Sequence, residues 1–383
     1  MCKYDIKNRK IKKYTNNNYY KTLEKSVGEM IIITDKYYFK EIKNTPFYDI
    51  QIKNKSLIIK LKKENNLIIS SWHNGGYQQN MDYILNQTVE NKDYDDAKTN
   101  TINEFQKQAF KKLNLPVDKT AGLITSACMD NVSIKTEKYE DLEVTAIITA
   151  GADKNGIKAG DPASFYEYNH NYKPLGTINI IIIINANLDP GTLVNAIITT
   201  TEAKTSVLED LKLESQYSTH IATGTGTDGI CVISNKSSNN HLENAGKHSK
   251  LGELIALTTR KATYEALYMQ TAMSNKYQKD VISRLTRFNI DYETLINKAT
   301  IPEDEYIPKF YEFINNPQNI SWISMMINLI DEYQNNLLKI SEITPLIMQT
   351  TQNYLEITYE DNLKTVDDIL NYIINSINKK IES

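Results

Sequence analysis

Two carboxylates, Asp161 and Asp228, are the best candidates in this sequence for acid–base chemistry, because each stands beside a glycine in a predicted loop. Asp228 lies in residues 222–229, where glycine alternates with small hydroxyl residues. Glycines let a backbone approach a ligand, and amides and hydroxyls supply hydrogen-bond donors. The stretch has no Gly-Lys-Ser/Thr after it and leads into a strand, so it is neither a P-loop nor a dinucleotide fingerprint. A tight turn with capping hydroxyls is the alternative, but the density of small polar residues favours a binding site.

Lys204 is a third candidate, because it falls on the apolar side of a helix predicted over residues 190–211. Burying an unpaired ammonium costs several kcal/mol. Lys204 therefore either snorkels or forms a structural ion pair, or it points into a site where it polarises a substrate carbonyl. Glu202 lies near the opposite side of this helix. The apolar stripe contains Leu193, Val194, Ile197, Val207, Leu208 and Leu211.

A run of five isoleucines, residues 180–184, predicts the strand that positions these groups. Five successive apolar residues cannot face water on alternate positions, so both faces of the strand must be covered. The run is too short to span a membrane, which takes about 20 apolar residues. Asp189 and Pro190 fit the N-cap and the first turn of the helix that follows. We therefore expect a central strand over residues 177–184.

Two further stretches could bind a ligand. Gly75 and Gly76 follow a predicted strand and His73, and they could either let the backbone reach a ligand or form only a bend. Residues 247–250 combine two lysines and a histidine with a predicted helix N-terminus, at which Ser249 is the N-cap. Such a place favours a negative charge. The alternative is that the two lysines are simply solvated.

Composition bounds the class of protein. The chain of 383 residues is long enough for two domains, and its net charge of −3 provides no basic field for nucleic acid. The three cysteines and five histidines show no paired or metal-binding spacing, so we expect a reducing compartment and no metal site. The charged, Asn-rich N-terminus has no apolar core segment. We therefore expect no signal peptide, no membrane span and a cytoplasmic protein.

We expect an α+β fold, in which helices flank a mixed β-sheet core and an all-α extension follows. All 14 glycines except Gly28 lie between Gly75 and Gly252, so the construction of the chain changes after that point. The predicted parts are a loose arm (1–27), an α+β domain (28–274) and a helical extension (275–383). The extension serves helical packing or a partner surface, and a homo-oligomer could form through it. Strands are predicted at residues 30–34, 37–42, 50–52, 57–61, 67–71, 123–128, 142–149 and 230–234. Helices are predicted at residues 100–113 and 251–273. The helical extension is predicted to break near Pro302, Pro308, Pro317 and Pro345.

Several motifs, found in one order along the chain, resemble the adenosylcobinamide amidohydrolase family of archaeal corrinoid salvage. The resemblance runs over roughly residues 67–272, and several motifs together are more specific than any one of them. They are residues 71–76, 85–87, 149–151, 159–161, 176–180, 188–191, 201–205, 223–229 and 247–253.

The resemblance implies a hydrolase that acts on a linear amide. The bond would join the aminopropanol arm to a propionate side chain of the corrin ring of adenosylcobinamide. The products would be adenosylcobyric acid and 1-amino-2-propanol. The partner is then a small corrinoid molecule, whose cobalt arrives with the substrate, so the sequence requires no cofactor and no metal ligand.

Amide hydrolysis needs an activated water or nucleophile, a stabiliser for the oxyanion and an acid for the leaving amine. We expect Asp161 or Asp228 to be the general base, with the other carboxylate positioning water or protonating the amine. Lys204 and the amides of residues 223–227 would hold the oxyanion. Thr225 or Thr227 as a nucleophile and His248 as the base are alternatives. The predicted substrate-binding residues are Gly75, Gly76, Gly151, Thr177, Asn179, Glu202, Thr223, Gly224, Gly226 and Thr227.

The alternative function is a non-catalytic corrinoid- or nucleotide-binding protein that uses the same glycine-rich loop. The sequence lacks the Asp-x-His-x-x-Gly signature of base-off cobalamin carriers, which counts against that version of a carrier. Release of aminopropanol from adenosylcobinamide would distinguish the enzyme from the carrier.

Overall fold

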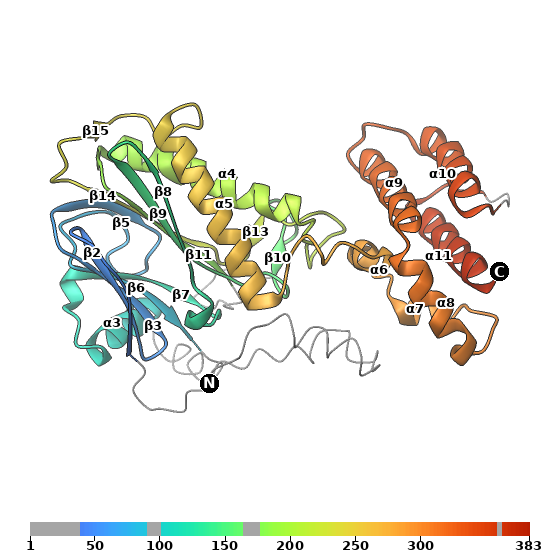
Figure 1. The fold of residues 1–383 in the computed structure, drawn as a ribbon, viewed down its shortest axis with the longest axis horizontal. Coiled ribbons are helices and arrows are strands. Elements are labelled where there is room, and N and C mark those ends of the chain that lie inside the picture. Colours follow the sequence, from blue (N-terminus) through green and yellow to red (C-terminus); the bar gives the residue numbers. More distant parts are fainter. Residues whose placement is uncertain (1–38, 90–100, 164–176, 358–361) are drawn as a thin grey trace. The chain divides into compact units, whose positions relative to one another are not determined.

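The computed structural model describes the whole chain except residues 1–38, 90–100, 164–176 and 358–361 (Figure 1). The predicted N-terminal arm and the strand predicted at residues 30–34 lie outside the described residues. Two compact units form. The first unit combines Met1–Gly151, Glu167–Ala203 and Thr227–Thr271, and the second combines Ala152–Tyr166, Lys204–Gly226 and Ala272–Ser383. The predicted domain boundary near residue 275 stays a prediction.

The first sheet of the first unit has five strands in the order β1-β2-β3-β6-β7. β6 and β7 run parallel, and the chain between them includes helix α3, as expected for a crossover connection. Phe110 of α3 packs with Ile58 and Leu85 on the outer face of this sheet. The elements are β1 (Phe39–Asn44), β2 (Tyr48–Lys53), β3 (Ser56–Leu61), β6 (Tyr83–Thr88), α3 (Ile102–Lys112) and β7 (Thr120–Thr125).

The second sheet has six strands in the order β5-β4-β14-β11-β9-β8. It is mixed, because β11 pairs in parallel with β14 and antiparallel with β9. Every residue of β11 is buried, so the central, doubly covered strand predicted from the isoleucine run is confirmed. The strands are β4 (Asn65–Ile69), β5 (Gly76–Gln79), β8 (Ser133–Tyr139), β9 (Leu142–Ala150), β11 (Ile178–Ile184) and β14 (Gly229–Asn235).

The two sheets pack face to face around one apolar core. Ile181 and Ile183 of β11 share this core with Ile59 and Leu123 of the other sheet. The outer face of the second sheet is covered by α5 (Lys250–Thr271), which packs on β9 and β8, and Figure 1 shows α4 (Pro190–Asp210) beside it. The described part of the first unit is therefore layered helix, sheet, sheet, helix. The predicted α+β class is confirmed. The N-terminal strands β1, β2 and β3 belong to the first sheet, and β4 belongs to the second.

One detail of the α4 prediction was wrong. Val194 was placed on the apolar stripe, but its side chain is 48% exposed. Leu193 and Leu208 are fully buried, as predicted, and the smaller residues Ala196 and Thr200 belong to the buried face as well. The Thr200 hydroxyl donates to the Ala196 carbonyl at 2.8 Å, so its burial leaves no orphaned donor.

The second unit consists of two short strands and a group of helices. β10 (Gly156–Ile157) pairs with β13 (Gly224–Thr225). Trp322 and Tyr306 are among the largest fully buried side chains of the helices, so this part has an apolar core of its own. The helices are α6 (Val281–Leu285), α7 (Tyr292–Ile296), α8 (Glu303–Asn315), α9 (Pro317–Gln334), α10 (Ile340–Leu355) and α11 (Val366–Glu382).

Two of the four predicted helix breaks in this extension are confirmed, and two are wrong. Pro302 precedes α8 and Pro317 opens α9, where a missing N–H costs little. Pro308 and Pro345 instead lie inside α8 and α10. Both are exposed, so water can reach the carbonyls that they leave without a donor. None of the helices that the structure describes is both long and apolar enough to cross a membrane.

Candidate functional site

The core between the two sheets becomes polar at one end. Asn179 continues the inner face of β11 beyond Ile181, because side chains alternate along a strand. Its amide nitrogen donates to Asn86 Oδ1 at 2.8 Å, and the Asn86 amide nitrogen donates to the Thr149 hydroxyl at 3.0 Å. All three side chains are at most 1% exposed. The hydrogen bonds link β11, β6 and β9, and this set is called the Asn–Asn–Thr network below.

The network tolerates no side chain at the neighbouring residue Gly229. A Cβ atom built there would lie 2.5 Å from Asn179 Oδ1. The Asn179 amide nitrogen also donates to the Ile124 carbonyl of β7 at 3.0 Å, which fixes the orientation of the amide. The hydrogen-bonded position of Asn179 therefore requires glycine at position 229.

The predicted residues Thr177 and Asp228 lie next to the network, at the amino ends of β11 and β14. The Thr177 hydroxyl donates to the Thr227 carbonyl, and the Ile178 amide donates to Asp228 Oδ1 at 3.3 Å. The Gly151 amide donates to the Thr177 carbonyl at 3.2 Å. Asp228 is exposed, while Thr177 is buried. Five predicted site residues, Gly151, Thr177, Asn179, Thr227 and Asp228, are thus brought together within the first unit.

Sequence reasoning missed Asn86 and Thr149 as site residues, although both stand in the motifs that carried the family resemblance. A usable signal existed. Both are polar residues at positions whose neighbours two residues earlier, Ile84 and Ile147, belong to the apolar core. A polar residue that continues a buried apolar alternation must find a partner.

Asp161 of the second unit is held by several donors. The Ser215 hydroxyl donates to its carboxylate at 2.6 Å, and the Lys158 amide donates at 3.0 Å. Burial acts to raise the pKa of Asp161, but hydrogen bonds from Ser215, Ser218 and Lys158, with the charge of His220, bring it below the ordinary value of 3.8. A carboxylate with a lowered pKa is a weaker proton acceptor at neutral pH. These hydrogen bonds favour a structural role, in which Asp161 holds Lys158 and Ser215 in place.

The glycine-rich loop is partly a strand. Gly224 and Thr225 form β13, paired with Ile157 and Gly156. The Thr223 amide donates to the Ile157 carbonyl at 3.0 Å, so of the amides predicted to bind the oxyanion, that of Thr223 is already engaged. Its hydroxyl accepts from the Ala159 amide at 2.9 Å. Within the second unit, this half of the loop is a structural connection, while Gly226 beyond it is exposed.

Lys204 is buried, as its position on the helix predicted. Its side chain is 6% exposed, and the hydroxyl of the adjacent Thr205 donates to the Thr223 carbonyl at 2.9 Å. Its role in binding an oxyanion stays a prediction. Asn155 is a second buried polar residue of this unit, at 1% exposure, and neither of its amide atoms has a hydrogen-bond partner among the described residues. Such an orphaned amide is normally explained by a bound water or ligand group.

The turn at Gly75 and Gly76 has a structural explanation. A Cβ atom on Gly75 would lie 2.1 Å from the Ser71 carbonyl oxygen, and Gly76 has a φ of +80°. The Asn74 amide donates to the carbonyls of Val117 and Thr120 at 3.0 and 2.9 Å. The main chain of this turn therefore needs glycine for its own packing, and substrate binding by Gly75 and Gly76 stays a prediction.

The predicted anion site before α5 is largely neutralised by acidic neighbours. Lys247 pairs with Glu202, and Lys250 pairs with Glu253 at 2.5 Å. Both lysines are exposed, as is His248. Exposed ion pairs contribute roughly 0–1 kcal/mol each, so these contacts describe a solvated surface. The roles predicted for Glu202 and His248 stay predictions.

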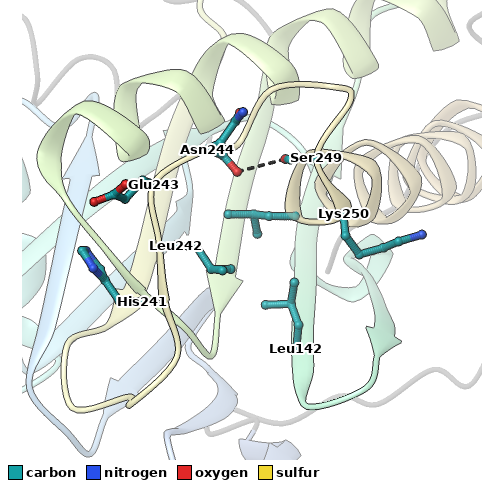
Figure 2. Close-up of a pocket in the computed structure, with 8 residues that line it drawn as sticks. Leu142, His241, Leu242, Glu243, Asn244, Ser249 and Lys250 are labelled. Atoms are coloured by element: carbon teal, nitrogen blue, oxygen red, sulfur yellow. Dashed lines mark hydrogen bonds between the residues drawn. The ribbon is translucent and has the colours of Figure 1, made fainter.

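A pocket of about 490 Å³ lies at the other end of β11 and β14, close to their carboxyl ends (Figure 2). Leu142 and Leu242 supply apolar walls, and His241, Glu243 and Lys250 supply polar groups. Because β11 has 7 residues, this pocket lies about 20 Å from the Asn–Asn–Thr network. Ser249 and Lys250 of the predicted anion site also line this pocket, whereas no site was predicted at His241 or Glu243.

Comparison with known proteins decides the family. The sequence model of the adenosylcobinamide amidohydrolase family matches residues 40–275, which is more than half of the chain. The chain belongs to the adenosylcobinamide amidohydrolase family. It is therefore assigned to the hydrolases that act on an amide, as its resemblance implied, and the Asn–Asn–Thr network and Asp228 both lie inside the matched range.

One of the individual relatives carries the name of this family. An adenosylcobinamide amidohydrolase of Methanosarcina mazei is 31% identical over 187 residues, which is 47% of this chain and 74% of that protein. An uncharacterized protein of Methanocaldococcus jannaschii is 33% identical over 231 residues, which is 57% of this chain and 88% of that protein. A crystal structure of a Pyrococcus horikoshii protein covers 63% of this chain and 81% of its own, at 11% identity and a TM-score of 0.29, too low to bear on the fold.

Replacing Asn86 tests the network. Asn86→Ala removes the donor to the Thr149 hydroxyl and one of the two acceptors of the Asn179 amide, which keeps its bond to the Ile124 carbonyl. We therefore expect the free energy of unfolding to fall by about 1–3 kcal/mol. Urea denaturation measures the change. The control Asn239→Ala alters an exposed asparagine and should stay within about 0.5 kcal/mol of the wild type. Equal effects of the two substitutions would contradict a role for the buried network.

The Asp161 hydrogen bonds predict a pH-dependent contribution to stability. Because the pKa of Asp161 is lower in the folded protein than its ordinary value of 3.8, its ionised form stabilises the fold above that pH. This contribution is lost as the pH falls through the folded pKa. The stability difference between the wild type and Asp161→Asn should therefore be largest at neutral pH and shrink below about pH 4. A difference in urea denaturation that stayed constant from pH 7 to pH 3 would contradict the account.

Proposed function

We propose that this protein hydrolyses the amide between the aminopropanol arm and the corrin propionate of adenosylcobinamide. The products are adenosylcobyric acid and 1-amino-2-propanol. The cobalt is part of the substrate and remains in the first product. The observation that carries this proposal is the match of the family over residues 40–275, supported by the Methanosarcina mazei relative that bears the enzyme's name.

Asp228 is the general base of the proposed reaction. A hydrolase of amides must remove a proton from the attacking water, and an accessible carboxylate can do so. Asp228 is exposed, and the Ile178 amide holds one of its oxygens. Asp161 is the poorer choice, because Ser215 and Lys158 donate to it and its pKa is lowered.

The Asn–Asn–Thr network positions the residues next to the base. Asn179 directly follows Ile178, whose amide bonds to Asp228, and its side chain is fixed by Asn86 and the Ile124 carbonyl. A backbone held by buried hydrogen bonds keeps the carboxylate in one place while the reaction proceeds, which avoids reorganisation. Lys204 as the oxyanion partner, and Thr225 as an alternative nucleophile, stay predictions from the sequence.

The reaction itself tests the proposal. Full-length protein is incubated with adenosylcobinamide, with and without EDTA, and the mixture is analysed by mass spectrometry. We expect adenosylcobyric acid and 1-amino-2-propanol in equal amounts. The Methanosarcina mazei relative serves as the positive control. Substrate that is bound but unchanged, under conditions in which the relative turns over, would favour a corrinoid carrier and contradict the proposed hydrolysis.

The base assignment predicts a selective loss of turnover. Asp228→Asn should lower kcat by about 10²–10⁴-fold and leave KM nearly unchanged, because a general base acts in the transition state. The matched control is Asp118→Asn, an exposed aspartate of the same unit, which should keep wild-type kcat. Thermal unfolding of both variants checks the fold. Near-normal turnover of folded Asp228→Asn would exclude the assignment.

A further inference from the structure

A short parallel pairing of two strands lies beyond the carboxyl end of β11 and brings together three side chains of types that bind metal ions. β12 (Asn187–Leu188) pairs with β15 (His241–Leu242), with Asn187 opposite His241 and Leu188 opposite Leu242. Alternate residues of an extended chain point to the same side. His241 and Glu243 therefore share one side of the segment, as Figure 2 shows, and Leu242 points the other way.

The apolar side of this pairing fixes the polar side in place. Leu188 is fully buried, and Leu242 is half-buried and lines the pocket. Asp189 directly follows Leu188, at the start of α4. The backbone that carries Asp189, His241 and Glu243 is therefore held in place by the packing of Leu188 and Leu242.

The donor atoms of these three residues already lie close together. One nitrogen of His241 and one carboxylate oxygen each of Asp189 and Glu243 all lie within 4.8 Å of one another. His241 Nε2 lies 3.2 Å from Asp189 Oδ2. A metal ion with bonds of about 2.1 Å holds adjacent ligand atoms about 3–3.5 Å apart. The exposed side chains can close this remaining gap by small torsional changes.

We propose that Asp189, His241 and Glu243 bind one divalent transition-metal ion. One imidazole and two carboxylates are a donor set suited to Zn²⁺ or Mn²⁺. A surface ion pair between His241 and Asp189 would explain two of the three residues, and exposed pairs of this kind stabilise a fold little. It gives no reason for the second carboxylate, whereas a divalent cation offsets the repulsion between the two.

Three protein ligands would leave open coordination positions on the metal ion. His241 and Glu243 belong to the segment that borders the pocket of about 490 Å³, but their side chains point away from Leu242, which faces Leu142 across it. All three ligand residues are exposed, so the coordination positions that they leave are open to solvent. Open positions are what separates an exchangeable site from a closed structural one. The three residues lie beyond the carboxyl ends of the parallel strands β11 and β14, which is where sheets with parallel strands commonly bind ligands. The bound ion would therefore present a free position to a small ligand.

The spacing of the ligands explains why the sequence predicted no metal site. Asp189 lies 52 residues before His241 in the chain. No short motif brings them together, and only the pairing of β12 with β15 does so. The site is independent of Asp228, which lies at the opposite ends of the same strands, so its test needs no substrate.

Isothermal titration of the full-length protein, freed of its purification tag and treated with EDTA, tests the site. ZnCl₂ and MnCl₂ are the probes. We expect one ion per chain for at least one of the metals. His241→Gln should weaken its binding at least about tenfold, which corresponds to about 1.4 kcal/mol. His248→Gln changes an exposed histidine outside the cluster and should bind as the wild type does.

A second pair of variants separates coordination from simple attraction to negative charge. Glu243→Gln and Glu243→His both remove the same charge, but only the histidine can still bind the metal ion. We expect Glu243→His to retain Zn²⁺ binding and Glu243→Gln to lose it. No saturable binding of either metal by the wild type, or equal binding by the wild type and His241→Gln, would overturn the proposal. Equal losses in the two Glu243 variants would overturn it as well.

Discussion

One chain of buried hydrogen bonds, from Asn179 to Asn86 to Thr149, decides how the two sheets of this protein end. Along most of β11 the inner face consists of isoleucine, and most contacts between the sheets are apolar. The Tyr48 hydroxyl of the first sheet also donates to the Thr145 hydroxyl of the second at 3.1 Å. At Asn179 the apolar contact is replaced by directed bonds of 2.8 and 3.0 Å. Buried amides are costly unless they are paired, so the bonds fix the registry of three strands. The Ile178 amide, next to Asn179 in the chain, donates to Asp228, so the position of Asp228 depends on that registry.

The sequence was sufficient for those parts of the fold that depend on local pattern. Five successive isoleucines could only be a doubly covered strand, and β11 is buried throughout. Short strands were predicted between turn residues in the N-terminal part, and those at residues 50–52 and 57–61 correspond to β2 and β3 of the first sheet. β5 and β8 were missed because Gly76–Gln79 and Ser133–Tyr139 are largely polar strands at the two edges of the second sheet, where one face meets water. Edge strands carry little apolar alternation, so periodicity does not reveal them.

The site was harder to predict, because its partners are distant in sequence. Asp161 was one of two carboxylates expected to be the base, and the hydrogen bond that it accepts from Ser215, 54 residues away, follows from no local pattern. The glycine-rich loop was expected to offer free amides, but β10 pairs with part of it. Asp228 and Asn179 do lie together, because β11 and β14 are parallel neighbours that begin at the same edge.

In the proposed reaction, the amide is cleaved at the amino ends of β11 and β14, beside the buried network. This position is away from the pocket bordered by His241 and Glu243. The most direct test is a crystal structure of the inactive Asp228→Asn variant with adenosylcobinamide bound. The account predicts that the scissile amide lies within about 4 Å of the side chain at position 228, or one water molecule away. A scissile amide bound instead in the pocket at the carboxyl ends of the same strands would contradict it.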